Sequence, residues 1–201
     1  ASVMSCWGIT EPDHGSDILM SGTDSFHNPK VTQQVKVVKK GNDYILNGQK
    51  SSWISNGPVA SNISLFVNLD PSLGMAGGGI CLVDLNQKGV SRGKPLNKMG
   101  QRELPQGEIF FDNAVCPAPD MIIDQESYEL MTDLTLAHAN ATMGAYFTGV
   151  AQAAYDLAVQ YTTERVQGGR RLCDHPSVQK KLFDMFTRTA ETLGVDPSDI
   201  L

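Results

Sequence analysis

Two short polar segments, each beside a tryptophan, hold residue types that can bind a cofactor. The first, residues 9–17, reads ITEPDHGSD and follows Trp7; the second, residues 53–57, reads WISNG and starts at Trp53. An aromatic side chain can cover the face of a flat cofactor, while hydroxyls and backbone N–H groups meet the nitrogens and oxygens at its edge. The pair of segments therefore indicates a site for a flat, polar-edged cofactor such as a flavin.

Each hydroxyl in these segments also has a purely structural interpretation. Thr10, Ser16 and Ser55 are residue types that cap turns by bonding to nearby backbone. Pro12 presets the backbone angle of a turn. Turn capping therefore stays open for each residue taken alone, and it is the presence of both segments in one chain that favours a cofactor site.

Composition limits the class of protein. The chain has 201 residues, of which 41% are hydrophobic, and a net charge of −6, which suits one large domain or two small ones. The acidic balance argues against a general nucleic-acid binder, and no apolar run approaches the ~20 residues of a membrane span. The first residues lack the basic and apolar stretches of a signal peptide. We therefore expect a cytoplasmic protein, or a mitochondrial matrix protein if the organism is a eukaryote.

The four cysteines form neither a metal-binding nor a disulfide pattern. They lie far apart in the sequence, without Cys-x-x-Cys spacing, so we expect no metal site and reduced, mostly buried thiols. These residues are Cys6, Cys81, Cys116 and Cys173.

The earlier part of the chain has the patterns of β-strands. Short apolar or alternating runs predict strands near residues 31–38, 44–46, 51–55, 63–69, 80–85 and 108–112. Gly41-Asn42 predicts a turn, and Asn47-Gly48 predicts a hairpin. The glycine cluster at residues 74–79 lacks the strand–turn–helix context of a phosphate-binding loop, and we interpret it as a flexible loop.

The later part of the chain has the patterns of helices. Apolar side chains step by three and four over residues 143–161, which places one apolar stripe along a long helix. Gly144 and Gly149 interrupt this stripe at a cost in helix stability, which suggests close packing at both. A second helix is predicted at residues 177–193.

A collinear series of motifs resembles the acyl-CoA dehydrogenase family. The motifs are TEP and GSD within residues 10–17, WISN at 53–56, MGQR at 99–102, FFDN at 110–113 and ER at 164–165. The resemblance implies an α+β fold. The family's central β-barrel, at residues 1–120, is followed by two long helices of an incomplete helical bundle, at residues 121–201. The family's N-terminal helical domain and later bundle helices have no counterpart here.

The resemblance implies FAD as the cofactor. In the family the first motif lies along the isoalloxazine ring, the second flanks the ring and places a hydroxyl at N5, and a later basic segment reaches the FAD pyrophosphate of a neighbouring subunit. The implied cofactor-binding residues are Trp7, Gly8, Ile9, Thr10, Ser16, Trp53, Ile54, Ser55, Arg165, Gln167 and His175. Ser16 is also the implied substrate-binding residue. For Arg165 and His175 a structural role is the alternative.

The implied substrate is an acyl-CoA. Because CoA is anionic, a CoA site on an acidic chain needs a local basic pocket. The candidate side chains for that pocket are Lys94, Lys98, Arg102, Arg165, Arg170 and Arg171. Taken singly, each is more typical of a solvated surface charge.

The implied reaction needs a carboxylate base. The family oxidises an acyl-CoA thioester to the 2,3-enoyl-CoA: a carboxylate takes the α proton, and the β hydrogen leaves as hydride to the flavin. Ala139 stands where an alternative glutamate would be, Asn140 stands where an arginine is usual, and Glu11 belongs to the turn on the flavin side. We therefore assign no catalytic residue within the chain and expect the base beyond Leu201.

Three interpretations follow from these motifs. The chain is part of a flavin-dependent acyl-CoA dehydrogenase, which we favour, or of a sister flavoenzyme such as an acyl-CoA oxidase, a nitroalkane oxidase or a desulfinase, or it is a truncated non-catalytic binding module. The resemblance further implies an electron-transfer flavoprotein or a similar acceptor, and a homodimer or homotetramer.

Overall fold

The computed structural model describes residues 3–194. Its internal contacts divide the chain into two compact units, Ala1–Thr135 and Leu136–Leu201. The long helix α1, Gln125–Glu164, begins in the first unit and continues into the second. A β-rich part followed by long helices confirms the predicted α+β class.

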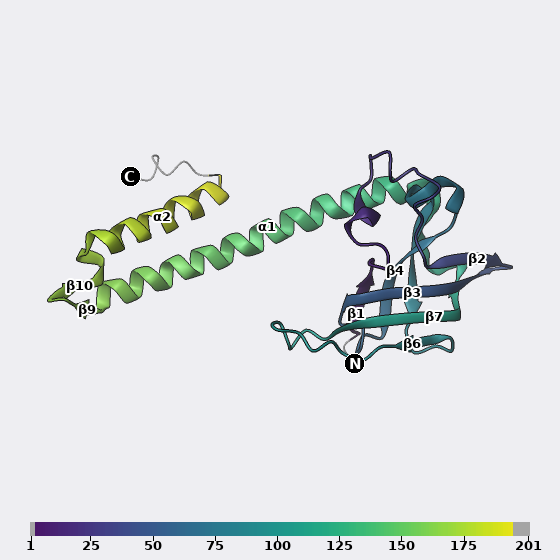
Figure 1. Cartoon of the computed structure of the whole chain (residues 1–201), viewed down its shortest axis with the longest axis horizontal. Coiled ribbons are helices and arrows are strands. Elements are labelled where there is room, and N and C mark those ends of the chain that lie inside the picture. Colours follow the sequence, from purple (N-terminus) through teal and green to yellow (C-terminus); the bar gives the residue numbers. More distant parts are fainter. Residues whose placement is uncertain (1–2, 195–201) are drawn as a thin grey trace. The chain divides into compact units, whose positions relative to one another are not determined.

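The first unit is built on one eight-stranded sheet (Figure 1). Its strands are β1 Ser5–Gly8, β2 Lys36–Lys40, β3 Asp43–Ser55, β4 Asn62–Asn68, β5 Gly78–Asp84, β6 Val90–Arg92, β7 Gln106–Pro117 and β8 Met121–Ile123. The pairing order is β6-β7-β3-β2-β4-β5-β8, with β1 parallel to β4. The Cys116 thiol of β7 lies 3.8 Å from the Leu82 carbonyl of β5. Since these strands are not neighbours in the pairing order, the sheet curls back on itself.

The predicted hairpin at Asn47-Gly48 is wrong, because β3 runs straight through it. Its pairing with β7 shifts register between Leu46 and Gly48, and Gly48 has a φ of 141°. A Cβ atom at Gly48 would lie 2.8 Å from both the Gln34 carbonyl oxygen and the Val35 Cα. The glycine therefore permits a close backbone approach inside a sheet. The chain reverses instead between β2 and β3, where Gly41-Asn42 predicts a turn.

The glycine cluster at residues 74–79 is not the flexible loop that the sequence suggests. It is buried, and it forms the end of a 3-10 segment, Pro71–Gly77, and the start of β5. A Cβ atom at Gly77 would overlap the Asp70 carbonyl, and one at Gly78 would overlap the Tyr128 ring. Close packing thus explains glycines that a loop would not require.

Two hydrophobic clusters stabilise the first unit. The larger lies within the sheet and includes Leu46, Ile63, Leu65, Ile109 and Phe111, among others. The second joins the start of α1 to the sheet through Ile18, Phe26, Phe66, Met75, Ala76, Ile80 and Tyr128. Within it the fully buried Tyr128 ring stacks on Phe26 at 6.4 Å between centroids and meets Phe66 edge-on at 6.0 Å.

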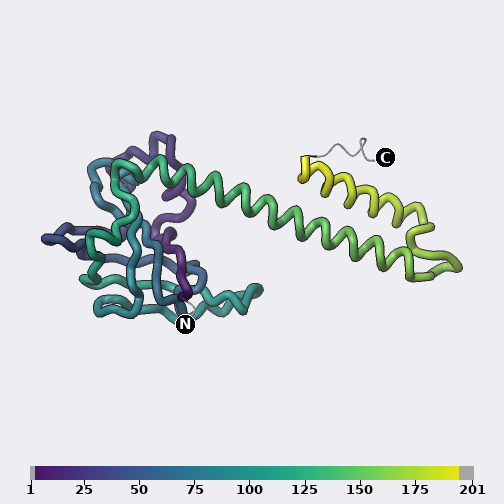
Figure 2. The backbone as a smooth tube through the Cα atoms, turned by 180° about the vertical axis from the view of Figure 1, so that it is seen from behind, coloured from purple at the N-terminus to yellow at the C-terminus, as the bar shows by residue number. Residues whose placement is uncertain are grey.

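The second unit is a helical hairpin. After α1, the short strands β9 Val166–Gln167 and β10 Arg170–Arg171 and a 3-10 turn, Leu172–Asp174, lead into α2, Pro176–Thr192. Figure 2 shows α2 returning alongside α1, and the Tyr155 and Phe186 rings pack 6.0 Å apart between them. Both predicted helices are present, but α1 starts well before residue 143.

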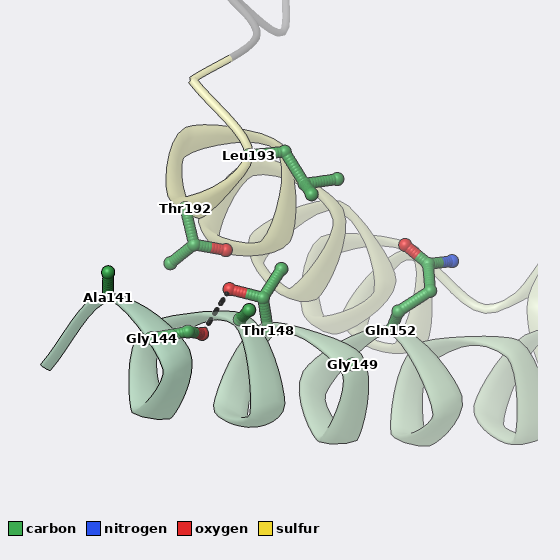
Figure 3. A pocket seen from close by; sticks show the side chains of 8 residues that line it. Ala141, Gly144, Thr148, Gly149, Gln152, Thr192 and Leu193 are labelled. Atoms are coloured by element: carbon green, nitrogen blue, oxygen red, sulfur yellow. Dashed lines mark hydrogen bonds between the residues drawn. The ribbon is translucent and has the colours of Figure 1, made fainter. Parts of the chain in front are cut away.

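The prediction of close packing at Gly144 and Gly149 is wrong, because no described residue packs closely against either glycine. A Cβ atom at either glycine would meet nothing within 4 Å. Both glycines instead line an open groove of about 630 Å³ between α1 and the end of α2, at Thr192 and Leu193 (Figure 3). The apolar stripe of α1 is likewise open, with Phe147 65% and Leu157 67% exposed.

The four thiols are free, as predicted. Cys6, Cys81 and Cys116 are buried, and Cys173 is half-buried. No helix among residues 3–194 combines the length and the apolar character needed to cross a bilayer.

Candidate cofactor site

The first motif begins on β1, where burial alternates along the strand. Cys6 and Gly8 point inward and Trp7 points outward, as the two faces of a strand require. The Trp7 indole is 40% exposed, and its inner part packs against Phe66 at 5.7 Å between ring centroids. A Cβ atom at Gly8 would lie 2.6 Å from the Ile63 Cδ1 atom, so packing against β4 accounts for this glycine.

The turn after β1 is held by a buried ion pair that the sequence analysis missed. The Lys50 ammonium of β3 donates to the Glu11 carboxylate at 2.8 Å and to the Ile9 carbonyl at 2.9 Å. The same carboxylate accepts the backbone N–H groups of Gln34 at 2.6 Å and Val35 at 3.0 Å. A lysine among polar residues is usually exposed, so no pattern predicts this burial.

The Asp17 side chain stabilises the later part of the same turn. Its carboxylate accepts hydrogen bonds from the His14 ring at 2.6 Å and from the Gly15 backbone N–H at 2.7 Å. Although partial burial alone would raise the pKa of Asp17, these bonds hold it below its ordinary value. Asp17, rather than the Ser16 hydroxyl, therefore bonds the backbone here, and the exposed Ser16 is not needed for the turn.

One backbone hydrogen bond joins the first motif to β3, just before the second motif. The Ser51 N–H of β3 donates to the Thr10 carbonyl at 2.9 Å, two residues before Trp53. Along β3, Ile54 is buried while Trp53, at 61%, is largely exposed and Ser55 is half-buried. Because side chains alternate along a strand, Trp53 and Ser55 share the outer face and Ile54 points into the core.

Ser55 belongs to a polar network between β3 and β7. The Gln106 side-chain amide donates to the Ser55 hydroxyl at 2.9 Å and to the Trp53 carbonyl at 3.2 Å. The Lys98 ammonium donates to the Gln106 side-chain carbonyl at 2.9 Å and to the Leu104 carbonyl at 2.8 Å. Gln106 was missed because it lies between the MGQR motif at residues 99–102 and the FFDN motif at residues 110–113 and belongs to neither.

Two of the basic-pocket candidates are engaged within their own loop. Lys98 is held as just described, and Arg102 donates to the Lys98 carbonyl at 2.9 Å and to the Asn97 side chain at 2.7 Å. Their immediate contacts are thus structural, and a role in binding CoA stays a prediction for both.

The predicted residues Arg165, Gln167 and His175 lie in the second unit. The His175 ring lies 3.0 Å from the Gln167 carbonyl, and the Leu172 N–H donates to the exposed Arg165 carbonyl at 2.8 Å. The intervening turn places Gly168 at φ 64° and Gly169 at φ 80°, which suits a two-residue hairpin turn. The structure therefore brings Arg165, Gln167 and His175 together in one segment.

The residues of the first unit fit a flavin ring. Two indoles, on Trp7 and Trp53, offer exposed aromatic surface, and the turn that follows Trp7 is hydrogen-bonded to β3, the strand of Trp53. The Ser55 hydroxyl lies on the same face of β3 as Trp53. Glu11 cannot serve as a free carboxylate base, since its fully buried carboxylate is bonded to Lys50 and to two backbone N–H groups. The arrangement suits binding of a flat ring better than proton abstraction.

Comparison with known proteins identifies this architecture. The chain matches the family model for the acyl-CoA dehydrogenase middle domain over residues 6–114 and the model for the acyl-CoA dehydrogenase C-terminal domain over residues 130–193. It is 30% identical over 187 residues to the cyclohex-1-ene-1-carbonyl-CoA dehydrogenase of Syntrophus aciditrophicus, covering 93% of this chain and 42% of that protein. The enzyme of the same name from Geobacter metallireducens is 32% identical, with 93% and 46% covered.

Solved structures agree with this match. Butyryl-CoA dehydrogenase from Megasphaera elsdenii superposes with a TM-score of 0.78 at 29% identity, covering 93% of this chain and 46% of that one. The chain thus spans less than half the length of these three proteins. Because the middle-domain model alone covers residues 6–114 of 201, the chain belongs to the acyl-CoA dehydrogenase family.

Proposed function

We propose that this chain provides the flavin-ring site of an FAD-dependent dehydrogenase that oxidises an acyl-CoA thioester to the 2,3-enoyl-CoA. One observation carries the proposal. The Ser51–Thr10 hydrogen bond ties the first motif to β3 just before the second motif, and a partly exposed indole lies at or beside each motif. An apolar ring face beside a few fixed polar groups is the usual composition of a cofactor site.

Each residue of the first unit has a distinct proposed role. Trp7 and the backbone from Gly8 to Thr10 lie along the isoalloxazine, and Trp53 flanks it. The Ser55 hydroxyl meets N5, while Ile54 anchors this part of β3 in the core. FAD, when bound, supplies the acceptor for hydride from the substrate's β carbon. The residues themselves orient the ring and exclude water from one of its faces.

Contacts further from the ring are also proposed. Ser16, exposed beside the turn, contacts the CoA arm of the substrate or the cofactor. Arg165, with Gln167 and His175 next to it, binds the FAD pyrophosphate of a neighbouring subunit. A guanidinium is suited to that anion because its planar fork makes two parallel hydrogen bonds.

The proton-abstracting base is proposed to lie outside these 201 residues. Glu11 is locked in its ion pair, and Ala139 on α1 has no acidic group. The other proposed partners are an acyl-CoA substrate, an electron-transfer flavoprotein or similar acceptor, and further copies of the protein in a homodimer or homotetramer. A reducing compartment, the cytoplasm or the mitochondrial matrix, fits four free thiols.

The test uses the intact gene product that contains this chain. We expect the purified protein to be yellow, with a flavin absorbance band, and to reduce an electron-accepting dye when given a saturated acyl-CoA. Acyl-CoAs of short, medium and long chain length should be compared. A colourless protein that takes up no FAD would contradict the proposal and favour a binding module. Flavin without acyl-CoA oxidation would point instead to a nitroalkane oxidase or a desulfinase.

A further inference from the structure

In the polar network of Lys98, Gln106 and Ser55, the donor and the acceptor of each hydrogen bond can be assigned. A lysine ammonium can only donate hydrogen bonds, so the Gln106 atom that lies 2.9 Å from Lys98 Nζ is the side-chain carbonyl oxygen. This fixes the orientation of the Gln106 amide, and its NH₂ group faces β3. Both amide hydrogens are then used, one for the Trp53 carbonyl and one for the Ser55 hydroxyl oxygen.

These bonds determine which further hydrogen bonds the Ser55 hydroxyl can form. A serine hydroxyl has one hydrogen to donate and two lone pairs to accept with. Because one lone pair accepts from Gln106 at 2.9 Å, the hydrogen has no partner in that direction. It is free to point away from β7, toward whatever lies over the outer face of β3.

We propose that Gln106, held by Lys98, is a positioning residue that turns the Ser55 hydroxyl hydrogen toward N5 of the flavin. This inference rests on the proposed function, which places N5 beside Ser55. Oxidised N5 carries a lone pair and accepts such a bond. Reduced flavin would carry a hydrogen on N5, and the second lone pair of the Ser55 oxygen could accept a bond from it. The network therefore serves both redox states without moving the backbone.

The network is anchored firmly enough to act in this way. Gln106 and Ser55 are directly paired residues of β7 and β3, and the Asn56 N–H donates to the Pro105 carbonyl at 2.7 Å beside them. Lys98 is also tied to the Leu104 carbonyl. A side chain fixed at both ends loses little further entropy when the hydroxyl binds its ligand.

The test compares variants of the intact gene product reconstituted with FAD that carries ¹⁵N at N5. We expect Gln106→Leu to weaken FAD binding about threefold to tenfold, the equivalent of one ordinary hydrogen bond. The N5 resonance of oxidised FAD should move downfield, toward its position in Ser55→Ala. Gln106→Glu keeps the size of the side chain and its bond to Lys98 but replaces the donor by an acceptor. It should give a similar shift by drawing the Ser55 hydrogen away from the ring.

Two controls separate positioning from general damage to the sheet. Gln49→Leu removes another glutamine that bridges β3 to β7, through Glu108 at 3.2 Å, and it should leave N5 unchanged. In the Ser55→Ala background, Gln106→Leu should have no additional effect on N5. An unchanged N5 resonance in both Gln106 variants, with a shift in Ser55→Ala, would overturn the role of Gln106 alone. A wild-type protein that binds no FAD would overturn the proposed function and, with it, this inference.

Discussion

The Glu11 carboxylate and the Lys50 ammonium form an ion pair of 2.8 Å in which both side chains are fully buried. The pair does more than balance charge. Glu11 also receives two backbone N–H groups from residues 34 and 35, and Lys50 also bonds the Ile9 carbonyl. The ion pair thus ties the backbone on both sides of Thr10 to β3 and to the segment before β2.

We predict that breaking this pair strongly destabilises the fold. Lys50→Met leaves an uncompensated buried carboxylate and should lower the free energy of unfolding by about 3 to 5 kcal/mol. Glu11→Gln keeps the side-chain shape but removes the charge, and it should have a cost of similar order. Chemical denaturation of each variant measures the change.

The double variant tests whether the two residues act together. If they do, Glu11→Gln with Lys50→Met should cost clearly less than the sum of the single changes. Lys40→Met is a suitable control, because Lys40 is exposed on β2 and its loss should change stability by about 0.5 kcal/mol or less. Simple additivity of the Glu11 and Lys50 effects would show that the pair is not coupled.

Stability should depend on pH through Lys50. Burial lowers the pKa of Lys50 from 10.5 to about 8, an effect that the Glu11 carboxylate opposes. Between these values the unfolded chain holds a proton that the native chain has released, so the free energy of unfolding should rise with pH across this window. Burial also raises the pKa of Cys6 from 9.0 to about 11, and this thiol has the opposite effect above pH 9.

The clean measurement is therefore a difference between two proteins. Both the native chain and Lys50→Met contain Cys6, so subtracting their free energies of unfolding largely removes the thiol contribution. The difference should grow as the pH rises from 8 toward 10.5. A difference that is flat over this range would mean that Lys50 titrates at its ordinary pKa despite its burial.

Replacing Trp53 should weaken FAD binding and hardly change the stability of the fold. Its side chain is 61% exposed, so Trp53→Ala should lower the free energy of unfolding by about 0.5 kcal/mol or less. Loss of a stacked aromatic ring should weaken FAD binding about threefold to tenfold. Trp53→Phe keeps a ring and should retain most of the affinity. A large loss of stability with unchanged FAD affinity would contradict a place beside the flavin.

Arg165 should strengthen FAD binding only in the oligomer, where it is proposed to reach the FAD of a neighbouring subunit. A guanidinium bonded to a phosphate contributes about 1.5 to 3 kcal/mol, so Arg165→Ala should weaken FAD binding about 10- to 100-fold. Arg188→Ala, at an exposed arginine on α2, is the matched control. Sedimentation of the intact protein should show at least a dimer at micromolar concentration. A strict monomer that still holds FAD tightly would contradict the cross-subunit role.

The sequence predicts elements well where the signal is local. The strands around Ile63, Ile80 and Ile109 and the helix at residues 177–193 are present because their apolar periodicity matches their burial. Predictions fail where the cause is non-local. Gly48 allows close approach of the backbone at Gln34 and Val35, outside its own strand, and Gly78 makes room for the Tyr128 ring of α1.

The candidate site shows the same difference between features with a local sequence signal and features that depend on distant residues. The Ser51–Thr10 hydrogen bond brings the first motif beside β3, the strand that carries Trp53 and Ser55, and the role of these residues in binding a cofactor stays a prediction. The side chains that hold these motifs, Lys50 and Gln106, carry no local signal, because their partners lie 39 and 51 residues away.

Finally, we predict that the 201-residue chain, supplied with FAD, does not turn over acyl-CoA. Removal of an α proton needs a positioned carboxylate, and general-base catalysis is commonly worth 10²- to 10⁴-fold. Glu11 is unavailable in its buried ion pair, and Ala139 occupies the alternative position on α1. The exposed stripe of α1 also leaves that helix without the apolar cover that would keep water from a reacting centre.

The measurement is dye reduction by the isolated chain with saturated acyl-CoAs of several chain lengths. The intact gene product serves as the positive control, and it shows that the assay and the substrates are sound. Steady turnover by the isolated chain, abolished by Ser55→Ala, would mean that a carboxylate within these residues acts as the base. Replacing the exposed acidic residues of α1 one at a time, beginning with Glu164, would then identify it.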